Sequence, residues 1–329
     1  MAVVVGMFDQ SFAHIGSRLD ALGLDIKVHT FGRDGMFVVD GVKMAPREIA
    51  LDYVWLSTHL NTDGFRDQAF DMMLGCKSIG VLQTFNAGLD HPFYKKLSEK
   101  GTRICNSSAQ GIAIAEYVLG QVLSVLQPIE LQRKLQAEKQ WKITPFREIS
   151  QTRWLIIGFG PIGEELAKRV KAFDAQIDVI RRTPKASSVI DRVGTMGDLK
   201  SFLGDADIVV LACSLTDETR GFVDASFFNA LKTGAILVNI ARGALIDDAQ
   251  LLLALDSGTL ATAILDVFHQ EPLPADSLFW GHPNVRMTGH TSFGGSGARS
   301  RWDALFLYNI ARFVRGEPLV QLVNPKDLV

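Results

Sequence analysis

The sequence predicts an α/β protein built from two doubly wound parallel sheets. Strand-like and helix-like segments alternate along nearly the whole chain, which is typical of that class. Its 329 residues exceed what one hydrophobic core usually holds, so we expect two domains. The segment 154–182 adds a specific unit, in which an apolar strand, a glycine-rich turn, an amphipathic helix and a second strand follow one another.

The first third of the chain predicts strands separated by helices. We expect strands at residues 2–6, 26–30, 53–57 and 79–83. Helices are expected at residues 11–23, 65–74 and 93–99. A longer helical pattern begins near Ala109, with apolar residues at i, i+3 and i+4 spacing, namely Ile112, Ala115, Leu119, Val122 and Leu126. A short linker should join this helix to the strand near Trp154.

The same alternation resumes after residue 182. Strands are expected at residues 208–212, 235–240, 261–267 and 285–288. Helices are expected between them at residues 198–204, 224–231 and 247–257, and a last amphipathic helix covers residues 299–314. Ligands of such sheets bind at the carboxyl ends of the strands, so candidate site residues are expected there.

The glycine-rich turn indicates the class of ligand. Gly158, Gly160 and Gly163 follow an apolar strand with the spacing G-x-G-x-x-G, and Pro161 and Ile162 lie within the turn. The first glycine permits the tight turn, the second lets a pyrophosphate approach the backbone, and the third lets the helix pack on the strand. The helix N-terminus then offers free N–H groups to phosphate oxygens. A Rossmann dinucleotide site is expected; the alternative is a glycine turn that serves packing alone.

The end of the next strand refines the choice of dinucleotide. An NAD site usually has an acidic residue there, whereas this chain has Arg181, Arg182 and Thr183. Guanidinium groups bind a phosphate through a planar fork, while a carboxylate would repel it. We therefore expect NADP to be preferred, with NAD as the alternative cofactor. A pair of solvated arginines is the other explanation of the same residues.

The composition limits the remaining classes of function. A formal charge of −2 gives no general attraction to nucleic acid or to a membrane surface. Cys76, Cys105 and Cys213 lack metal-like spacing, so buried thiols in a reducing compartment are expected. The first residues do not resemble a signal peptide, and Glu116 and Gln121 interrupt the best candidate for a membrane span. A cytoplasmic protein without metal, nucleic-acid or membrane partners is expected.

Polar side chains follow three strands of the second half. Arg242 follows one strand beside Gly243, and Asp266 ends another. Glu271 lies in the loop after Asp266, and His290 follows a third strand. Arginine can hold a substrate carboxylate and polarise a carbonyl, and protonated histidine can protonate the carbonyl oxygen. A carboxylate beside the histidine orients the ring. Each residue alone also fits a surface ion pair or a loop contact, but together they favour reduction of a 2-oxo acid.

These segments resemble the D-isomer-specific 2-hydroxyacid dehydrogenase family over essentially the whole chain. The motifs that carry the resemblance are GFGPIG at 158–163, NIARGALID at 239–247, LDVFHQEPLP at 265–274 and the histidine segment at 288–295. The resemblance implies a flavodoxin-like substrate domain and a Rossmann nucleotide domain, with a cleft between them. It implies a substrate domain at 1–103 and 297–329, a nucleotide domain at 104–296, and a homodimer joined through the nucleotide domain.

The resemblance also implies roles for individual residues. Arg242, Glu271 and His290 match the family's catalytic residues, and Arg242 and His290 would also contact substrate. Asp266 should face the nicotinamide carboxamide. The segment FNAGLD matches the loop that holds the substrate carboxylate through Asn86, Ala87 and Gly88, although a plain strand-to-helix turn would also explain the glycine. The further implied cofactor contacts are Cys213, Ser214, Thr219, Ile240 and Ala241.

The chain departs from the family pattern at two positions. Arg181 replaces the usual acidic residue, which agrees with the preference for NADP expected from charge. Ser214 replaces the usual proline of a C-P-L-T-x-x-T segment, so the stiffness of that loop must come from elsewhere.

The leading expectation is an NADPH-dependent reductase that converts a small 2-oxo acid, glyoxylate or hydroxypyruvate, to the D-2-hydroxy acid. A dehydrogenase of another acid, such as phosphoglycerate, is an alternative, although the segment 85–92 offers little positive charge for a phosphate. A cofactor-sensing interaction protein, like the corepressors that share this fold, is a further alternative, because those proteins keep the same three residues.

Overall fold

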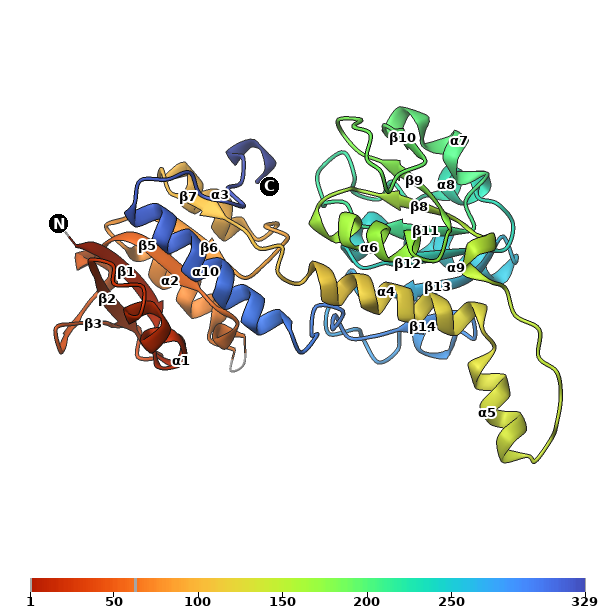
Figure 1. Ribbon diagram of the computed structural model, residues 1–329, viewed down its shortest axis with the longest axis horizontal. Helices are drawn as coiled ribbons and strands as arrows, with labels where there is room; N and C mark the ends of the chain where they lie inside the picture. Colours follow the sequence, from red (N-terminus) through yellow and green to blue (C-terminus); the bar gives the residue numbers. More distant parts are fainter. Residues whose placement is uncertain (1, 62–63, 329) are drawn as a thin grey trace. The chain divides into compact units, whose positions relative to one another are not determined.

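The computed structural model describes residues 2–61 and 64–328 and divides into two compact units (Figure 1). The first unit comprises Met1–Gln110 and Ser296–Val329, and the second comprises Gly111–Gly295. The first boundary follows residue 110 rather than residue 103, because strand β7 (Arg103–Cys105) pairs with β6 of the first sheet. The first unit is therefore assembled from both ends of the chain.

Within its described residues, the first unit holds one seven-stranded sheet with the order β4-β3-β2-β1-β5-β6-β7. The strands that precede β7 are β1 (Val3–Phe8), β2 (Ile26–Phe31), β3 (Phe37–Val39), β4 (Val42–Met44), β5 (Ala50–Leu56) and β6 (Ser78–Thr84). From β2 to β7 the neighbouring strands are parallel, as expected. The four predicted strands are present with slightly different ends.

The β3–β4 hairpin at one edge of this sheet was not expected, and it adds antiparallel pairs to an otherwise parallel sheet. Strand β3 pairs antiparallel with both β2 and β4. The turn between β3 and β4 is Asp40-Gly41, with φ angles of 49° and 82°. An Asp-Gly pair favours the type I′ turn, whose two central residues both need positive φ, and the twist of that turn matches a two-stranded ribbon.

Helices cover both faces of the first sheet. They are α1 (Asp9–Asp20), α2 (Arg66–Gly75), α3 (Pro92–Glu99) and α10 (Ala298–Val314). Helices α1 and α10 pack on one face, where the Trp55 and Phe306 rings stack with centroids 4.3 Å apart. Helices α2 and α3 pack on the other face, where Phe70 stacks on Phe93. Helix α10 thus closes a core that the first third of the chain leaves open.

The second unit holds a seven-stranded sheet with the order β10-β9-β8-β11-β12-β13-β14, within the residues that the structure describes. Every neighbouring pair is parallel. The strands are β8 (Arg153–Ile157), β9 (Gln176–Ile180), β10 (Arg192–Gly194), β11 (Ile208–Leu211), β12 (Ala235–Asn239), β13 (Leu260–Leu265) and β14 (Val285–Met287). Strand β10 was not predicted; the other six were. The strand order reverses between β8 and β11, which is where such sheets bind nucleotides.

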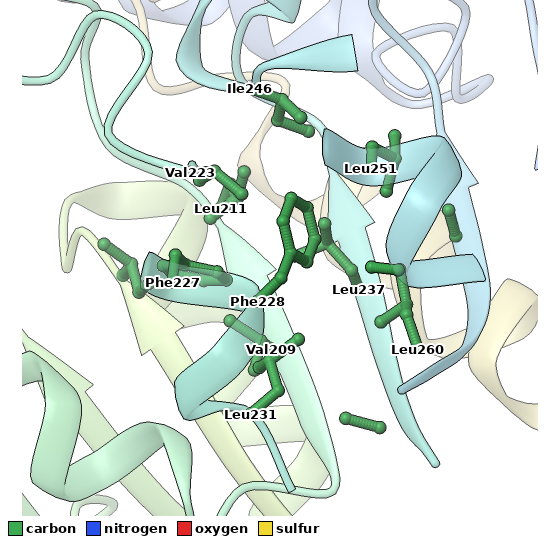
Figure 2. Packing of buried hydrophobic residues seen from close by; sticks show 14 of the residues in the cluster. Val209, Leu211, Val223, Phe227, Phe228, Leu231, Leu237, Ile246, Leu251 and Leu260 are labelled. Atoms are coloured by element: carbon green, nitrogen blue, oxygen red, sulfur yellow. The ribbon is translucent and has the colours of Figure 1, made fainter. Parts of the chain in front are cut away.

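Both faces of the second sheet are buried, because its strands are apolar at successive positions. Helices α4 (Gly111–Leu126) and α6 (Pro161–Lys171) cover one face. Helices α7 (Leu199–Leu203), α8 (Ala225–Ala230) and α9 (Asp248–Asp256) cover the other, where Phe227 and Phe228 of α8 meet Val209, Leu211 and Leu237 of the sheet (Figure 2). Burial on both faces holds these strands in place, and the candidate site residues follow the ends of the strands.

The connection from α4 to β8 is longer than expected. It contains a second helix, α5 (Ile129–Ala137), followed by residues 138–148 without helix or strand. Within this connection Trp141 is fully exposed and Ile143 is 91% exposed. No single described helix is long and apolar enough to span a membrane, although α4 and α5, bent by 57°, would meet the length and composition criteria as a pair.

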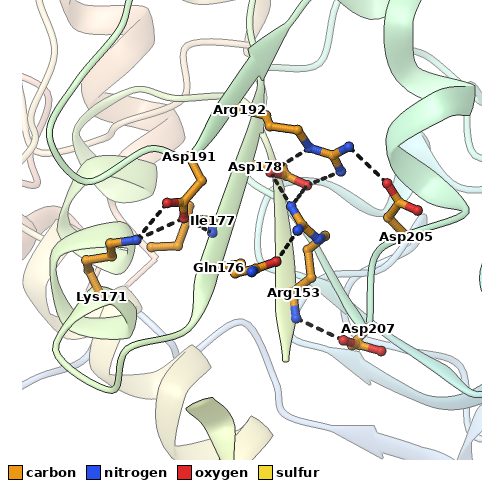
Figure 3. Close-up of polar contacts among 9 residues, drawn as sticks. All are labelled: Arg153, Lys171, Gln176, Ile177, Asp178, Asp191, Arg192, Asp205 and Asp207. Carbon is orange, nitrogen blue, oxygen red and sulfur yellow. Dashed lines mark hydrogen bonds and ion pairs between the residues drawn. The ribbon is translucent and has the colours of Figure 1, made fainter. Parts of the chain in front are cut away.

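Charged side chains pair near the amino ends of the strands in the second sheet (Figure 3). The buried carboxylate of Asp178 accepts hydrogen bonds from the guanidinium groups of Arg153, at 3.0 and 3.1 Å, and Arg192, at 3.1 and 2.6 Å. Arg192 also pairs with Asp205 at 2.9 Å. Asp207 accepts from the Arg153 N–H at 2.9 Å and from Lys232 at 2.6 Å. These contacts tie β8, β9, β10 and β11 together.

Candidate active site

The glycine turn after β8 has the geometry that the sequence predicted for phosphate binding. Gly158 has φ of 96°, and a Cβ there would lie 2.5 Å from the backbone N of Cys213. A Cβ on Gly163 would lie 2.6 Å from the carbonyl oxygen of Gly158, so the third glycine lets α6 pack against the turn. A Cβ on Gly160 would meet no described atom within 4 Å. The backbone at the second glycine is therefore open to a ligand.

The start of α6 is also suited to binding a phosphate. Its N-cap residue, Gly160, makes no side-chain cap, and Pro161 and Ile162 open the first turn. The first N–H groups of a helix need acceptors that the helix cannot supply, and a phosphate oxygen is one such acceptor. The described residues therefore fit a dinucleotide pyrophosphate, with the open face at Gly160 and the start of α6 as its cradle.

Arg181 lies next to this turn. Its guanidinium carbon is 5.7 Å from the centroid of the Phe159 ring, and Phe159 is the residue between the first two glycines. Its backbone N–H donates to Gly194, which fixes the end of β9 against β10. Arg182 and Thr183 are exposed. The Phe159 ring thus holds one cation beside the turn, at the carboxyl end of β9.

The loop 213–219 is braced without the usual proline. The Thr219 hydroxyl donates to the Ser214 carbonyl at 2.8 Å, and the Thr216 N–H donates to the Thr219 hydroxyl at 2.8 Å. Cys213 is half-buried rather than fully buried as expected, because it follows the end of β11 beside the glycine turn; burial still raises the pKa of its thiol to about 11. Cys76 and Cys105 are buried, as expected.

The three predicted catalytic residues follow β12, β13 and β14, which are adjacent in the sheet. Arg242 precedes a short turn, residues 243–245, and one of its guanidinium N–H groups donates to the Ala241 carbonyl at 2.6 Å. The buried side chain of Asn239 donates to the Arg242 carbonyl at 2.8 Å and accepts from the Ala241 N–H at 3.1 Å. This amide, which was not predicted, fixes the backbone that carries Arg242. Ile240 and Ala241 are buried.

Gly243 brings the Arg242 turn against the loop that carries Glu271. A Cβ on Gly243 would lie 2.0 Å from the Phe268 carbonyl carbon and 2.3 Å from the His269 N, so only glycine fits. The His269 ring donates from Nε2 to the Ile246 carbonyl at 2.7 Å across the same junction. The sequence pattern alone did not indicate this close contact at Gly243.

His290 and Glu271 form a direct pair. Nδ1 of His290 lies 2.7 Å from Oε2 of Glu271, and the other carboxylate oxygen accepts from the Phe268 N–H at 2.9 Å. His290 has φ of 50°, a left-handed conformation that is uncommon for residues other than glycine. Its side chain is 42% exposed, so the ring is oriented by Glu271 yet accessible. An oriented, accessible imidazole can donate a proton to a ligand.

Asp266 holds the His290 segment in this conformation. Its buried carboxylate accepts from the Thr288 hydroxyl at 2.5 Å, the Thr291 N–H at 2.8 Å and the Ser292 N–H at 3.0 Å. Its backbone carbonyl accepts from the His290 N–H at 2.8 Å. Tyr117 of α4 extends the chain of hydroxyls through Thr288 at 2.7 Å. Thr288 and Tyr117 were not predicted: Thr288 lies in the histidine segment 288–295 but nothing in the segment marks its hydroxyl, and Tyr117 is distant in sequence.

The predicted substrate loop belongs to the first unit and follows β6. The Asn86 N–H donates to the Thr84 hydroxyl at 3.3 Å, and the Asn86 side chain donates to the Tyr94 hydroxyl at 2.7 Å. The Ala87 carbonyl accepts from Asn106 at 2.9 Å. Within the described parts of the chain, the N–H groups of Ala87 and Gly88 donate to no protein group. These two N–H groups remain the available donors of the loop.

Comparison with known proteins places this geometry in a family context. Residues 119–292 match the family described as D-isomer specific 2-hydroxyacid dehydrogenase, NAD binding domain. The matched segment runs from α4 to the loop after His290, so it contains the glycine turn and all three predicted catalytic residues.

Relatives of this chain carry reductase names. A glyoxylate/hydroxypyruvate reductase A from Arabidopsis thaliana is 34% identical over 248 residues, which is 74% of this chain and 78% of the relative. A hydroxyphenylpyruvate reductase from Plectranthus scutellarioides is 33% identical over 244 residues, 73% of this chain and 77% of the relative. A D-isomer specific 2-hydroxyacid dehydrogenase from Xanthobacter autotrophicus Py2, solved with NADPH and MES, matches with a TM-score of 0.78 and 27% identity over all of both chains.

Proposed function

Because the chain belongs to the D-isomer-specific 2-hydroxyacid dehydrogenase family, an oxidoreductase family, we propose that it reduces a small 2-oxo acid, glyoxylate or hydroxypyruvate, to the D-2-hydroxy acid with NADPH. The observation that carries the proposal is the His290–Glu271 pair at 2.7 Å, with Arg242 at the end of a strand in the same sheet. The reductase names of the relatives supply the favoured substrates.

The residues of the chain have distinct roles in the proposed reaction. Arg242 would bind the substrate carboxylate through parallel N–H···O bonds and polarise the neighbouring carbonyl. His290 would donate a proton to the carbonyl oxygen as it becomes a hydroxyl, while Glu271 keeps the ring in the orientation that allows the transfer. When bound, the dinucleotide supplies the hydride to the carbonyl carbon. The N–H groups of Ala87 and Gly88 are proposed as further donors to the carboxylate.

Arg181 is proposed to select NADPH. A 2′-phosphate needs a cationic partner near the adenosine ribose, and the end of the second strand after the glycine turn is where that ribose is recognised in Rossmann folds. Arg181 follows β9 with its guanidinium against the Phe159 ring, and Arg182 and Thr183 are exposed next to it. The NADPH complex of the Xanthobacter relative agrees with this choice.

A homodimer is proposed as the assembly. The resemblance implies contact through the nucleotide domain, and the exposed apolar side chains between α4 and β8 give that contact a physical basis. Two of them are Trp141 and Ile143. Burying such residues between two copies would remove apolar surface from water.

The proposal is tested with a panel of 2-oxo acids assayed with NADPH and with NADH, following absorbance at 340 nm. We expect reduction of glyoxylate or hydroxypyruvate with a higher kcat/KM for NADPH. Arg181→Asp should lower the ratio of kcat/KM with NADPH to kcat/KM with NADH by roughly 10- to 100-fold. This factor is the usual contribution of one charge-assisted hydrogen bond. Lys185→Asp makes the same charge change in the exposed loop that follows and should leave the ratio within about twofold. Failure to reduce any 2-oxo acid with either cofactor would contradict the proposed function.

A further inference from the structure

A second group of titratable side chains lies in the first unit, outside the residues discussed so far. It consists of His14 of α1, His59 in the loop after β5, and Arg299 and Asp303 in the first turns of α10. The His14 and His59 rings are tilted against each other with centroids 5.4 Å apart. Three segments that are distant in sequence therefore bring two imidazoles and a guanidinium together.

Asp303 anchors one side of this group. Its carboxylate, which is largely buried, accepts from Nε2 of His14 at 2.8 Å and from Arg18 at 2.9 Å. A single carboxylate neutralises Arg18, so it leaves Arg299 and any protonated imidazole uncompensated. The local charge is therefore positive, and it rises when His59 takes up a proton.

The His59 ring contacts a chain of two serine hydroxyl groups. Its Nδ1 lies 3.2 Å from the Ser57 hydroxyl, which in turn lies 2.6 Å from the hydroxyl of Ser11. Both serines are buried, while His59 is half-buried. Among residues 2–61 and 64–328, no group bonds to His59 Nε2 or forms an ion pair with Arg299. One ring nitrogen and one guanidinium are thus available at the surface of the first unit.

The group borders the predicted substrate loop. Leu56 at the end of β5 pairs in register with Thr84 at the end of β6, so residues 57–59 and 85–88 leave neighbouring strands at the same edge. Neighbouring strands are about 4.8 Å apart. From the side of α10, Trp302 contacts the Phe85 ring edge to face at 6.1 Å. His59 and the first turns of α10 therefore flank the loop that carries Asn86, Ala87 and Gly88.

We infer that His59 and Arg299 form a subsite for a second anionic group of the substrate, beyond the carboxylate next to the carbonyl. The inference rests on the proposed function and extends its substrates beyond glyoxylate and hydroxypyruvate to 2-oxo acids with an anionic far end, of which a dicarboxylic 2-oxo acid is the simplest. Arg299 would supply the charge, and His59 would donate from Nε2. His14 packs against the His59 ring, and Asp303 positions His14.

The pH dependence follows from the groups that face His59. Burial lowers the pKa of His59, the charges of Arg299 and His14 lower it further, and Asp303 opposes this. An anion bound beside the ring would favour the protonated form and so bind more tightly as the pH falls. The advantage of an anionic far end should therefore grow as the pH is lowered below about 6.5, the ordinary histidine value.

The kinetic test compares 2-oxoglutarate with 2-oxopentanoate, which has the same chain length and a methyl group in place of the second carboxylate. Wild-type protein should prefer 2-oxoglutarate by at least about tenfold in kcat/KM, mainly through KM. Arg299→Gln should remove most of that preference and leave 2-oxopentanoate within about twofold. Arg315→Gln, an exposed arginine at the other end of α10, is the matched control and should change neither value. Equal efficiency with the two acids, or an unchanged preference in Arg299→Gln, would overturn the subsite.

A binding test separates the subsite from the proposed reaction. The ring C–H signals of the histidines are followed by NMR while glutarate or pentanoate is added, and the His59→Gln variant identifies the His59 signal. Glutarate should move that signal and pentanoate should not. If glutarate shifts the His59 signal but the protein reduces no 2-oxo acid, the subsite is supported and the proposed function is contradicted. If the protein reduces glyoxylate but glutarate does not shift the His59 signal, the proposed function is supported and the subsite is contradicted.

Discussion

The two ends of the strands in the second sheet use charge in opposite ways. Near the amino ends, the carboxylate of Asp178 is fully buried and bonded to two guanidinium groups, so its charge is satisfied within the fold. Past the carboxyl ends, His290 and Glu271 are 42% and 36% exposed, and His290 has a left-handed backbone. One end ties strands together, and the other leaves ionisable groups accessible to solvent.

This difference separates the charges that stabilise the second sheet from those of the proposed active site, along the same strands. Strand β9 carries both uses within a few residues, with Asp178 in the ion-pair group and Arg181 after the end of the strand beside the glycine turn. Buried pairs are costly to break, because removal of one partner leaves an uncompensated charge. Exposed groups with little packing contribute little to folding. Substitutions at the two ends should therefore give opposite phenotypes.

The largest effect is expected at His290. The change His290→Asn removes the proposed proton donor, so kcat should fall by about 10²- to 10⁴-fold. The melting temperature and the affinity for NADPH should stay close to those of the wild type, because the ring is exposed and the glycine turn is untouched. Steady-state kinetics, fluorescence titration with NADPH and thermal unfolding measure the three quantities. Wild-type kcat in this variant would exclude the assigned role.

The change Asp178→Ala tests the ion pairs near the amino ends of the strands in the second sheet. It leaves Arg153 and Arg192 without their shared carboxylate, and we expect a loss of roughly 3–5 kcal/mol in the free energy of unfolding. Activity per folded molecule should be close to that of the wild type. Urea unfolding at 25 °C and kinetics on the folded fraction provide the measurement. If Asp178→Ala lost activity and kept its stability, the amino ends of the strands would not have the stabilising role given to them here.

A smaller effect is expected for Arg242→Lys. Lysine keeps the charge but cannot form the planar fork of a guanidinium with a carboxylate. We expect kcat/KM for 2-oxo acids to fall by roughly 10- to 100-fold, equivalent to one charge-assisted hydrogen bond, with kcat affected as well as KM. Arg220→Lys provides a control at an arginine of the same unit outside the predicted site. If Arg242→Lys were as active as this control, the guanidinium would not orient the substrate.

The smallest expected effect concerns Asp207 and pH. Burial raises the pKa of Asp207, but Lys232, the Arg153 N–H and Arg147 outweigh burial and hold the pKa below the ordinary value. The ionised group therefore stabilises the fold fully above about pH 4, and that contribution is lost as the pH falls toward the folded-state pKa. Asp207→Asn should lower the free energy of unfolding by about 1.5 kcal/mol at pH 7. The difference from wild type should shrink below about pH 4; a constant difference would exclude the ionised carboxylate as its source.

Local patterns predicted the parts of the fold that depend on local chemistry. The glycine turn, the buried strands and the amphipathic helices each leave a signal within a short segment, such as the spacing of Gly158, Gly160 and Gly163. The Asp40-Gly41 turn was also a local signal, and its hairpin was missed because the strand pattern was read only for parallel pairing. Helix α5 was missed because its sequence has little apolar character and just one buried residue, Leu135.

The contacts between distant segments could not be predicted in the same way. Arg242, Glu271 and His290 were identified because each follows a strand and carries a group that reduction of a 2-oxo acid needs. The hydrogen bonds of Thr288, Tyr117 and Asn239 depend on partners that only the folded chain supplies. The group around His59 and Arg299 is the clearest case. Its members come from α1, the loop after β5 and α10, and the sequence of the substrate loop alone suggested little positive charge.

The discontinuous first unit has a consequence for synthesis on the ribosome. Residues 111–295 form the second unit as one continuous stretch, so it can fold as soon as that stretch has emerged. The first unit is translated earlier but must wait for α10, whose Phe306 covers Trp55 and whose Ile310 belongs to the same core. Until then, the part of this face that α10 covers is exposed to water and to other nascent chains, while α1 can already cover the rest. We therefore expect the part of the chain made first to be the part that matures last.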